Sequence, residues 1–136
     1  MKRADATTLE TVLVVDDDVL IRMAIADYLR SCGFRVFEAA NGDEAVQIMT
    51  EPDIAIDIVL SDVEMSGSMQ GFALANWVRA NRPDLPIILA GSASRAPKKA
   101  ADLCEDGPML AKPYEPGIVV DWIKRQLAAR KARTTD

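Results

Sequence analysis

The chain has 136 residues, of which 49% are apolar, and a formal net charge of −5. This length corresponds to about one domain with a hydrophobic core, and the acidic balance does not favour general binding to nucleic acids or anionic membranes. No apolar run approaches the roughly 18–20 residues of a membrane span. No apolar stretch follows Lys2 and Arg3, so the N-terminus does not resemble a secretory signal. Residues 1–9 are expected to form a loose tail.

The composition also limits the chemistry. The chain contains no histidine, which excludes catalysis by Ser-His or Cys-His pairs. Its two cysteines, Cys32 and Cys104, have no spacing typical of a metal site. We expect both to be buried free thiols in a reducing compartment, which indicates the cytoplasm.

The first elements are a strand, a helix and a second strand. Residues 11–15 form a β-branched apolar run typical of a strand buried on both faces. Asp18 is expected to cap the following helix, which ends at Gly33, and residues 34–39 predict the second strand. The expected inner face of the helix comprises Ile21, Ala24, Ile25, Tyr28 and Leu29.

The alternation continues to the end of the chain. Asn41 and Glu44 resemble a capping box that begins a helix ending at Pro52. The next expected elements are a strand at 54–60, a helix around Leu74, Trp77 and Val78, a strand at 86–90, a weak helix at 95–105, a strand at 108–111, and a last helix through Val119, Trp122, Ile123 and Leu127. This pattern predicts an α/β fold, a doubly wound five-stranded parallel sheet flanked by five helices, in one domain over residues 10–129. Residues 130–136 are expected to form a polar tail.

Polar residues occur where several predicted strands end. They are Asp16 and Asp17 after the first strand, Asp62 at the third, Gly91 and Ser92 at the fourth, and Lys112 at the fifth, just before Pro113. Ligands of open parallel sheets bind beyond these carboxyl ends. If the first and third strands are neighbours, three carboxylates converge on one small volume, with Lys112 on the far side.

Three close carboxylates repel one another, and a hard divalent cation removes that cost. Oxygen ligands without histidine favour Mg²⁺ or Mn²⁺ over zinc. Open coordination positions beside Lys112 would suit a phosphoryl group, and a carboxylate can be the nucleophile that forms an acyl phosphate. Each residue alone also fits a turn, a helix cap or a solvated surface position. Their combination at matching strand ends predicts a phosphoryl-transfer site.

The segments "VLVVDDD", "DIVLSDVEM", "GFALANWVR", "LPIILAGS" and "MLAKPYEP", in this order, resemble the receiver domains of two-component response regulators. The resemblance covers about residues 11–128 and implies a flavodoxin-like sheet with strand order 2-1-3-4-5. It also implies that Asp62 is the phosphoacceptor, taking its phosphoryl group from a phosphohistidine on a sensor histidine kinase or histidine phosphotransferase.

The same resemblance implies roles for the neighbouring residues. Asp17 would bind Mg²⁺ directly and Asp16 largely through water, while Asp62 and the backbone carbonyl of Glu64 would complete the protein ligands. Lys112 would pair with the phosphoryl group. The bond between Lys112 and Pro113 is often cis in this family, which would aim the lysine inward.

Three positions depart from the family pattern, and the first is Ser66, which stands in place of the usual proline after Met65. Gly91 stands where receivers carry a hydroxyl residue that follows the phosphoryl group, and the adjacent Ser92 is expected to point differently. Met109 stands at the aromatic switch position in the fifth strand and has no ring to report phosphorylation. The phosphorylation chemistry is therefore predicted to be intact, and the switch to be altered.

The resulting prediction is a stand-alone response regulator, not an enzyme in the usual sense, that signals by contact with a downstream protein or by phosphorelay. A homodimer is left open. The alternative is a degenerate receiver that binds partners without being phosphorylated. A phosphatase resembling haloacid dehalogenases is disfavoured, because its D-x-D pair lies at one strand end, whereas here the acids lie on two strands.

Overall fold

The computed structural model describes residues 9–63, 71–92, 109–112 and 114–134. The strands are β1 (Thr11–Val15), β2 (Arg35–Ala39), β3 (Ile58–Asp62), β4 (Ile87–Ser92) and β5 (Met109–Lys112); the helices are α2 (Val19–Ser31), α3 (Gly42–Thr50), α4 (Gly71–Asn81) and α6 (Pro116–Thr134). All strand pairs are parallel, and the order is β2-β1-β3-β4-β5. The expected flavodoxin-like parallel sheet is confirmed. The helix expected at residues 95–105 lies outside the described residues.

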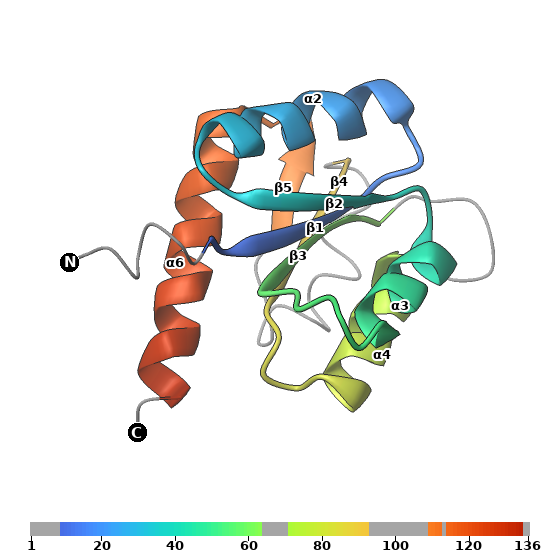
Figure 1. The fold of residues 1–136 in the computed structure, drawn as a ribbon. Helices are drawn as coiled ribbons and strands as arrows, with labels where there is room; N and C mark the ends of the chain where they lie inside the picture. The colour runs from blue at the N-terminus through green and yellow to red at the C-terminus, as the bar shows by residue number, and fades with distance from the viewer. Residues whose placement is uncertain (1–8, 64–70, 93–108, 113, 135–136) are drawn as a thin grey trace.

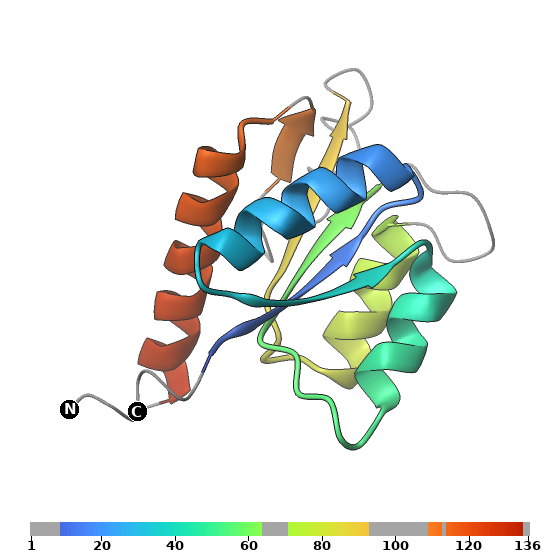
Figure 2. The ribbon, with the colours of Figure 1, turned by 45° about the horizontal axis from the view of Figure 1, so that its top comes forward.

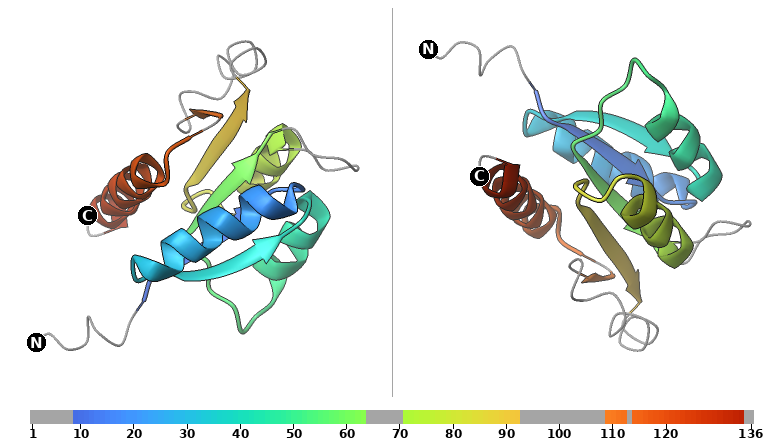
Figure 3. Two further views of the ribbon diagram at one scale, coloured as in Figure 1. Left: turned by 90° about the horizontal axis from the view of Figure 1, so that it is seen from above. Right: turned by 90° about the horizontal axis from the view of Figure 1, so that it is seen from below.

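Helices cover both faces of the sheet (Figure 1). Helices α2 and α6 lie on one face, and α3 and α4 lie together on the other, as Figure 2 and the two views in Figure 3 also show. Side chains of β1 alternate between these layers: Val12 and Val14 belong to the core beneath α2 and α6, whereas Leu13 and Val15 belong to the core beneath α3 and α4. This period-two alternation with apolar residues on both sides explains why β1 reads as an uninterrupted apolar run.

Local signals define several element ends. The carboxylate of Asp18 accepts from the backbone N–H of Ile21 at 3.1 Å, which confirms the predicted cap of α2. At the other end, Gly33 takes a positive φ of 99°, a conformation that suits glycine. The carboxamide oxygen of Asn41 accepts from the Glu44 N–H at 2.9 Å and so caps α3. Glu44 in return accepts from the N–H of Ala40, one residue earlier than in the expected capping box.

The buried face of α2 differs from the predicted one. Ile25, Ala26 and Leu29 are buried, while Ile21 and Tyr28 are more than a third exposed. The helix therefore rests on the sheet through a narrower stripe, rotated toward Ala26. The apolar side chains at its N-terminal end remain in solvent, with Leu20 80% exposed. Sequence periodicity could not predict this, because the contact face of a helix depends on how it crosses the strands.

Three further expectations change. The third strand begins at Ile58 rather than residue 54. Cys32 is a free thiol, as expected, but it is exposed rather than buried because it lies at the C-cap of α2; Cys104 lies outside the described residues. Helix α6 continues to Thr134, into the segment predicted to be a tail. Among the helices described, none combines the length and the apolarity that a membrane span requires.

The extension of α6 is anchored at the amino ends of the strands, opposite the carboxyl edge. Arg130 donates to the main-chain oxygen of Asp57 at 2.8 Å, and its guanidinium lies 3.8 Å from the Asp84 carboxylate. Asp57 in turn accepts from the N–H of Thr11 at 2.8 Å, which joins α6 to the start of β1. Arg130 thus links the helix to the loop before β3.

Arg130→Ala is expected to lower the free energy of unfolding by about 1–2 kcal/mol, because it removes a partly buried charge-assisted hydrogen bond. Urea denaturation measures the change. The control is Lys131→Ala, which removes an exposed ion pair to Glu10 with an N–O distance of 3.5 Å and should cost at most about 0.5 kcal/mol. Equal losses in the two variants would show that the contact with Asp57 is unimportant.

Candidate functional site

The strand order and register bring the acidic residues together. Strand β1 lies between β2 and β3, and Val15 is paired with Ser61. The next residues along the chain, Asp16 and Asp62, therefore lie side by side at the carboxyl edge of the sheet. In an open parallel sheet this edge is where ligands bind. The predicted convergence of the two segments is confirmed.

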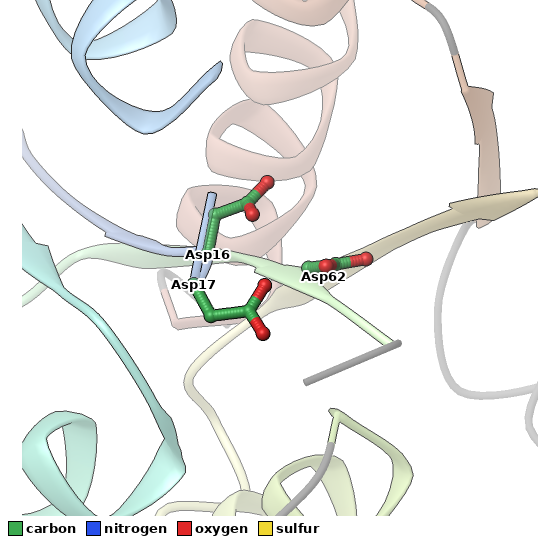
Figure 4. A group of neighbouring side chains, drawn as sticks. All are labelled: Asp16, Asp17 and Asp62. Carbon is green, nitrogen blue, oxygen red and sulfur yellow. The ribbon is translucent and has the colours of Figure 1, made fainter. Parts of the chain in front are cut away.

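Three carboxylates form the cluster drawn in Figure 4. One oxygen from each of Asp16, Asp17 and Asp62 lies within 4.8 Å of the others. Asp16 and Asp62 are buried, with 3% and 6% of their surface exposed, whereas Asp17 is exposed to solvent. The cluster is therefore built on two buried acids at neighbouring strand ends and is open on the side of Asp17.

The three consecutive aspartates, residues 16–18, have different roles in the structure. The carboxylate of Asp16 accepts from the Asp18 N–H at 2.9 Å, which tightens the turn after β1. Asp18 directs its own carboxylate to the start of α2, as its cap. Of these three aspartates, Asp16 and Asp17 join Asp62 in the cluster. The run of acids thus combines a helix cap with two members of the site.

Sequence reasoning missed Arg22 and Glu38. The Arg22 guanidinium donates to the main-chain oxygen of Asp16 at 2.8 Å and to the Glu38 carboxylate at 3.2 Å. It is largely buried, with 16% of the side chain exposed. An arginine in the first turn of an amphipathic helix is usually solvated, and no sequence signal separates Arg22 from such residues. Its role depends on β2 lying beside β1.

The donor set fits a hard divalent cation. The cluster offers carboxylate oxygens alone, and the chain has no histidine to compete as a ligand. Hard cations such as Mg²⁺ bind oxygen ligands and commonly use one or two carboxylates together with substrate phosphates. The exposed position of Asp17 leaves one side of the cluster accessible from solvent.

The other predicted site residues are placed only by their backbone. Gly91 is buried in β4 and paired with Ala111, one position beyond the pair formed by Ala90 and Asp62. Ser92 and Lys112 are paired at the ends of β4 and β5, at the same edge of the sheet as Asp62, and Met109 begins β5 opposite Leu89. Glu64 and Pro113 lie outside the described residues.

Comparisons with known proteins identify the family. Residues 12–124 match the profile described as the response regulator receiver domain. The chain therefore belongs to the receiver domains of two-component signalling, which are phosphoacceptor modules rather than classical enzymes.

Relatives agree with this assignment. Over 87 residues, 64% of this chain, it is 41% identical to the sensor kinase CckA of Brucella abortus (strain 2308). Over 142 aligned positions, 98% of this chain, it is 34% identical to the sensor histidine kinase RcsC of Salmonella typhimurium. The chain covers only 9% and 14% of these longer proteins.

A solved structure supports the fold. The response regulator TrrA of Thermotoga maritima, crystallised in complex with Mg(2+)-BeF, superposes with a TM-score of 0.76 at 25% identity. The match covers 87% of this chain and 99% of that one.

Proposed function

We propose that this receiver accepts a phosphoryl group on Asp62 in a Mg²⁺-dependent reaction. The donor would be a phosphohistidine on a sensor histidine kinase or histidine phosphotransferase. The output would be contact with a downstream protein or transfer of the phosphoryl group to a further histidine. Mn²⁺ is expected to replace Mg²⁺, because both prefer oxygen ligands.

One observation carries this proposal: the carboxylate oxygens of Asp16, Asp17 and Asp62 gather within 4.8 Å at the carboxyl edge of the sheet. Asp16 and Asp62 are buried there. Without compensation, such an arrangement carries the cost of like-charge repulsion, which a divalent cation would remove.

The residues have distinct proposed roles. Asp16, Asp17 and Asp62 would hold Mg²⁺, joined by the main-chain carbonyl of Glu64 on the strength of the family resemblance. When bound, the cation would neutralise negative charge on the phosphoryl oxygens. The ionised Asp62 carboxylate attacks phosphorus, the bond from phosphorus to the imidazole nitrogen breaks, and its electron pair stays on that nitrogen. Lys112 would neutralise a phosphoryl oxygen as a point charge.

The protein's main contribution is positioning and charge neutralisation, because phosphoryl transfer asks for little other covalent chemistry. The complex of TrrA with Mg(2+)-BeF supports the choice of cation. The cytoplasmic location and the histidine-containing partners are parts of the proposal that rest on family membership.

A second candidate is a receiver that binds its partners without being phosphorylated. It is favoured by Gly91, which offers no side chain in the buried end of β4 near Asp62. A glycine at this position cannot contact an arriving phosphoryl group through a hydroxyl. In this second candidate the acidic cluster would persist but would not react.

The two candidates are separated by incubating the protein with acetyl phosphate and recording its intact mass. With Mg²⁺ we expect a gain of one phosphoryl group, and with excess chelator we expect none. No gain in the presence of Mg²⁺ would reject the first candidate and favour the second. An equal gain with and without Mg²⁺ would reject the cation's proposed role.

A further inference from the structure

The side chain of Arg22 returns from the first turn of α2 to the end of β1, where the acidic cluster begins. Its Nη1 donates to the main-chain oxygen of Asp16 at 2.8 Å, and its Nε donates to Oε1 of Glu38 at 3.2 Å. Glu38, on β2, also accepts from Nη2 of Arg30 at 3.1 Å. The guanidinium is thus held between two strands, and its planar fork engages both partners at once.

The contact controls a particular peptide plane. The carbonyl of Asp16 and the N–H of Asp17 belong to one rigid planar unit. The N–H of Asp16 is held separately, by the main-chain oxygen of Ala39 at 3.1 Å. Holding the Asp16 oxygen therefore sets the orientation of the next peptide, and with it the direction in which the Asp17 side chain leaves the backbone.

Asp17 is the member of the cluster that most needs this support. Asp16 and Asp62 are buried, so neighbouring atoms restrict their carboxylates, whereas Asp17 is exposed. In Figure 4 the carboxylate of Asp17 is nonetheless directed toward Asp62. A fixed backbone plane reduces the conformational entropy that Asp17 loses when it binds a cation.

We propose that Arg22, held by Glu38, is a positioning residue for the acidic cluster: it orients the peptide between Asp16 and Asp17 so that three carboxylates are ready to bind Mg²⁺. This inference rests on the proposed function in its requirement for the cation. Arg22 has no part in contacting the phosphoryl group. It acts through the backbone, as residues beyond the ligand shell of metal sites commonly do.

The test must separate the effect of the positive charge of Arg22 on cation binding from the effect of its contact with the backbone. Removing Arg22 alone deletes a positive charge near the cluster, which by itself strengthens the attraction for a cation. The lead variant is therefore the double change Arg22→Met with Glu38→Gln, which leaves the net charge unaltered. Arg30→Met is a second control: it removes the other arginine that contacts Glu38, leaves the Asp16 contact in place, and shows how much the loss of one positive charge from α2 by itself changes cation binding.

Isothermal titration with MgCl₂ gives the dissociation constant without any phosphoryl donor. The double variant is expected to bind Mg²⁺ roughly tenfold more weakly than wild type, the lower end of the effect of losing support around metal ligands. Arg30→Met should stay within about twofold of wild type. Arg22→Lys, which keeps the charge but cannot make both contacts as a fork, should fall between wild type and the double variant.

The kinetics of phosphorylation give a second readout, because the Mg²⁺ concentration for half-maximal rate and the rate at saturating Mg²⁺ should respond differently. In acetyl phosphate reactions, the Mg²⁺ concentration for half-maximal rate should rise with the dissociation constant. The rate at saturating Mg²⁺ should stay within about twofold, because the reacting residues are unchanged. A general loss of folded protein would instead lower the rate at every Mg²⁺ concentration.

The outcomes distinguish the two proposals. If wild type binds Mg²⁺ and the double variant binds equally well, the role of Arg22 is overturned while the proposed function stands. If wild type binds no Mg²⁺, the cation's part in the proposed function fails first. If circular dichroism shows that the double variant does not fold, Arg22→Lys decides: weaker binding supports the inference, and wild-type binding overturns it.

Discussion

Asp62→Asn is expected to abolish phosphoryl incorporation from acetyl phosphate, lowering its rate by roughly a thousandfold or more, as removal of a covalent nucleophile generally does. Asparagine keeps the shape of the buried side chain, which is 6% exposed at the end of β3. Its neutral amide is a poor nucleophile and removes one of three clustered charges. Intact-mass spectrometry with time measures the loss.

The matched control is Asp18→Asn. Asp18 is next to the cluster in sequence but uses its carboxylate to cap α2, and asparagine caps a helix about as well as aspartate. This variant loses the same charge next to the cluster and should be phosphorylated at close to the wild-type rate. Phosphorylation of Asp62→Asn at the wild-type rate, or its loss in Asp18→Asn, would contradict the assignment of Asp62.

Mg²⁺ is expected to stabilise the wild-type fold strongly. At a concentration one hundred times its dissociation constant, a ligand that binds only the folded state raises the free energy of unfolding by about 2.7 kcal/mol. If Asp17→Asn weakens binding about a hundredfold, the same concentration stabilises the variant by only about 0.4 kcal/mol. Urea denaturation with and without MgCl₂ measures both values.

The difference in the free energy of unfolding between Asp17→Asn and wild type should change sign when the cation is removed. Oxygens of Asp17 lie within 4.8 Å of its acidic neighbours, and two like charges at about 4 Å repel by about 1 kcal/mol even at the dielectric constant of water. Asp17→Asn is therefore expected to be more stable than wild type in chelator and less stable in saturating Mg²⁺. Asp18→Asn should keep the wild-type response to Mg²⁺. A response to Mg²⁺ in Asp17→Asn equal to that of wild type would exclude Asp17 as a ligand.

Several features were predictable because they depend on neighbouring residues. The bounds of β1 follow from a continuous apolar run, and the caps at Asp18 and Asn41 follow from residue type and spacing. The alternation of strands and helices predicted a parallel sheet. Once the sheet was expected, the acids after two of its strands had to lie at one edge, because parallel strands end on the same side.

Other features were not predictable because they depend on partners distant in the chain. The face of α2 that is buried depends on how that helix crosses the sheet, so Ala26 replaced Tyr28 in the contact. The polar end of α6 stays helical while Arg130 reaches Asp57, 73 residues earlier in the chain. The contact of Arg22 with Glu38 requires β2 to lie beside β1.

The sequence by itself determined which groups are available: three aspartates in a row, a fourth after a later apolar run, and no histidine. It also determined that these acids follow strands, through the local periodicity of the residues before them. Only the tertiary structure decided that β1 and β3 are neighbours with Val15 opposite Ser61. A shift of one residue in that register would turn the Asp62 side chain to the other face of the sheet, so the distance between the carboxylates depends on long-range packing.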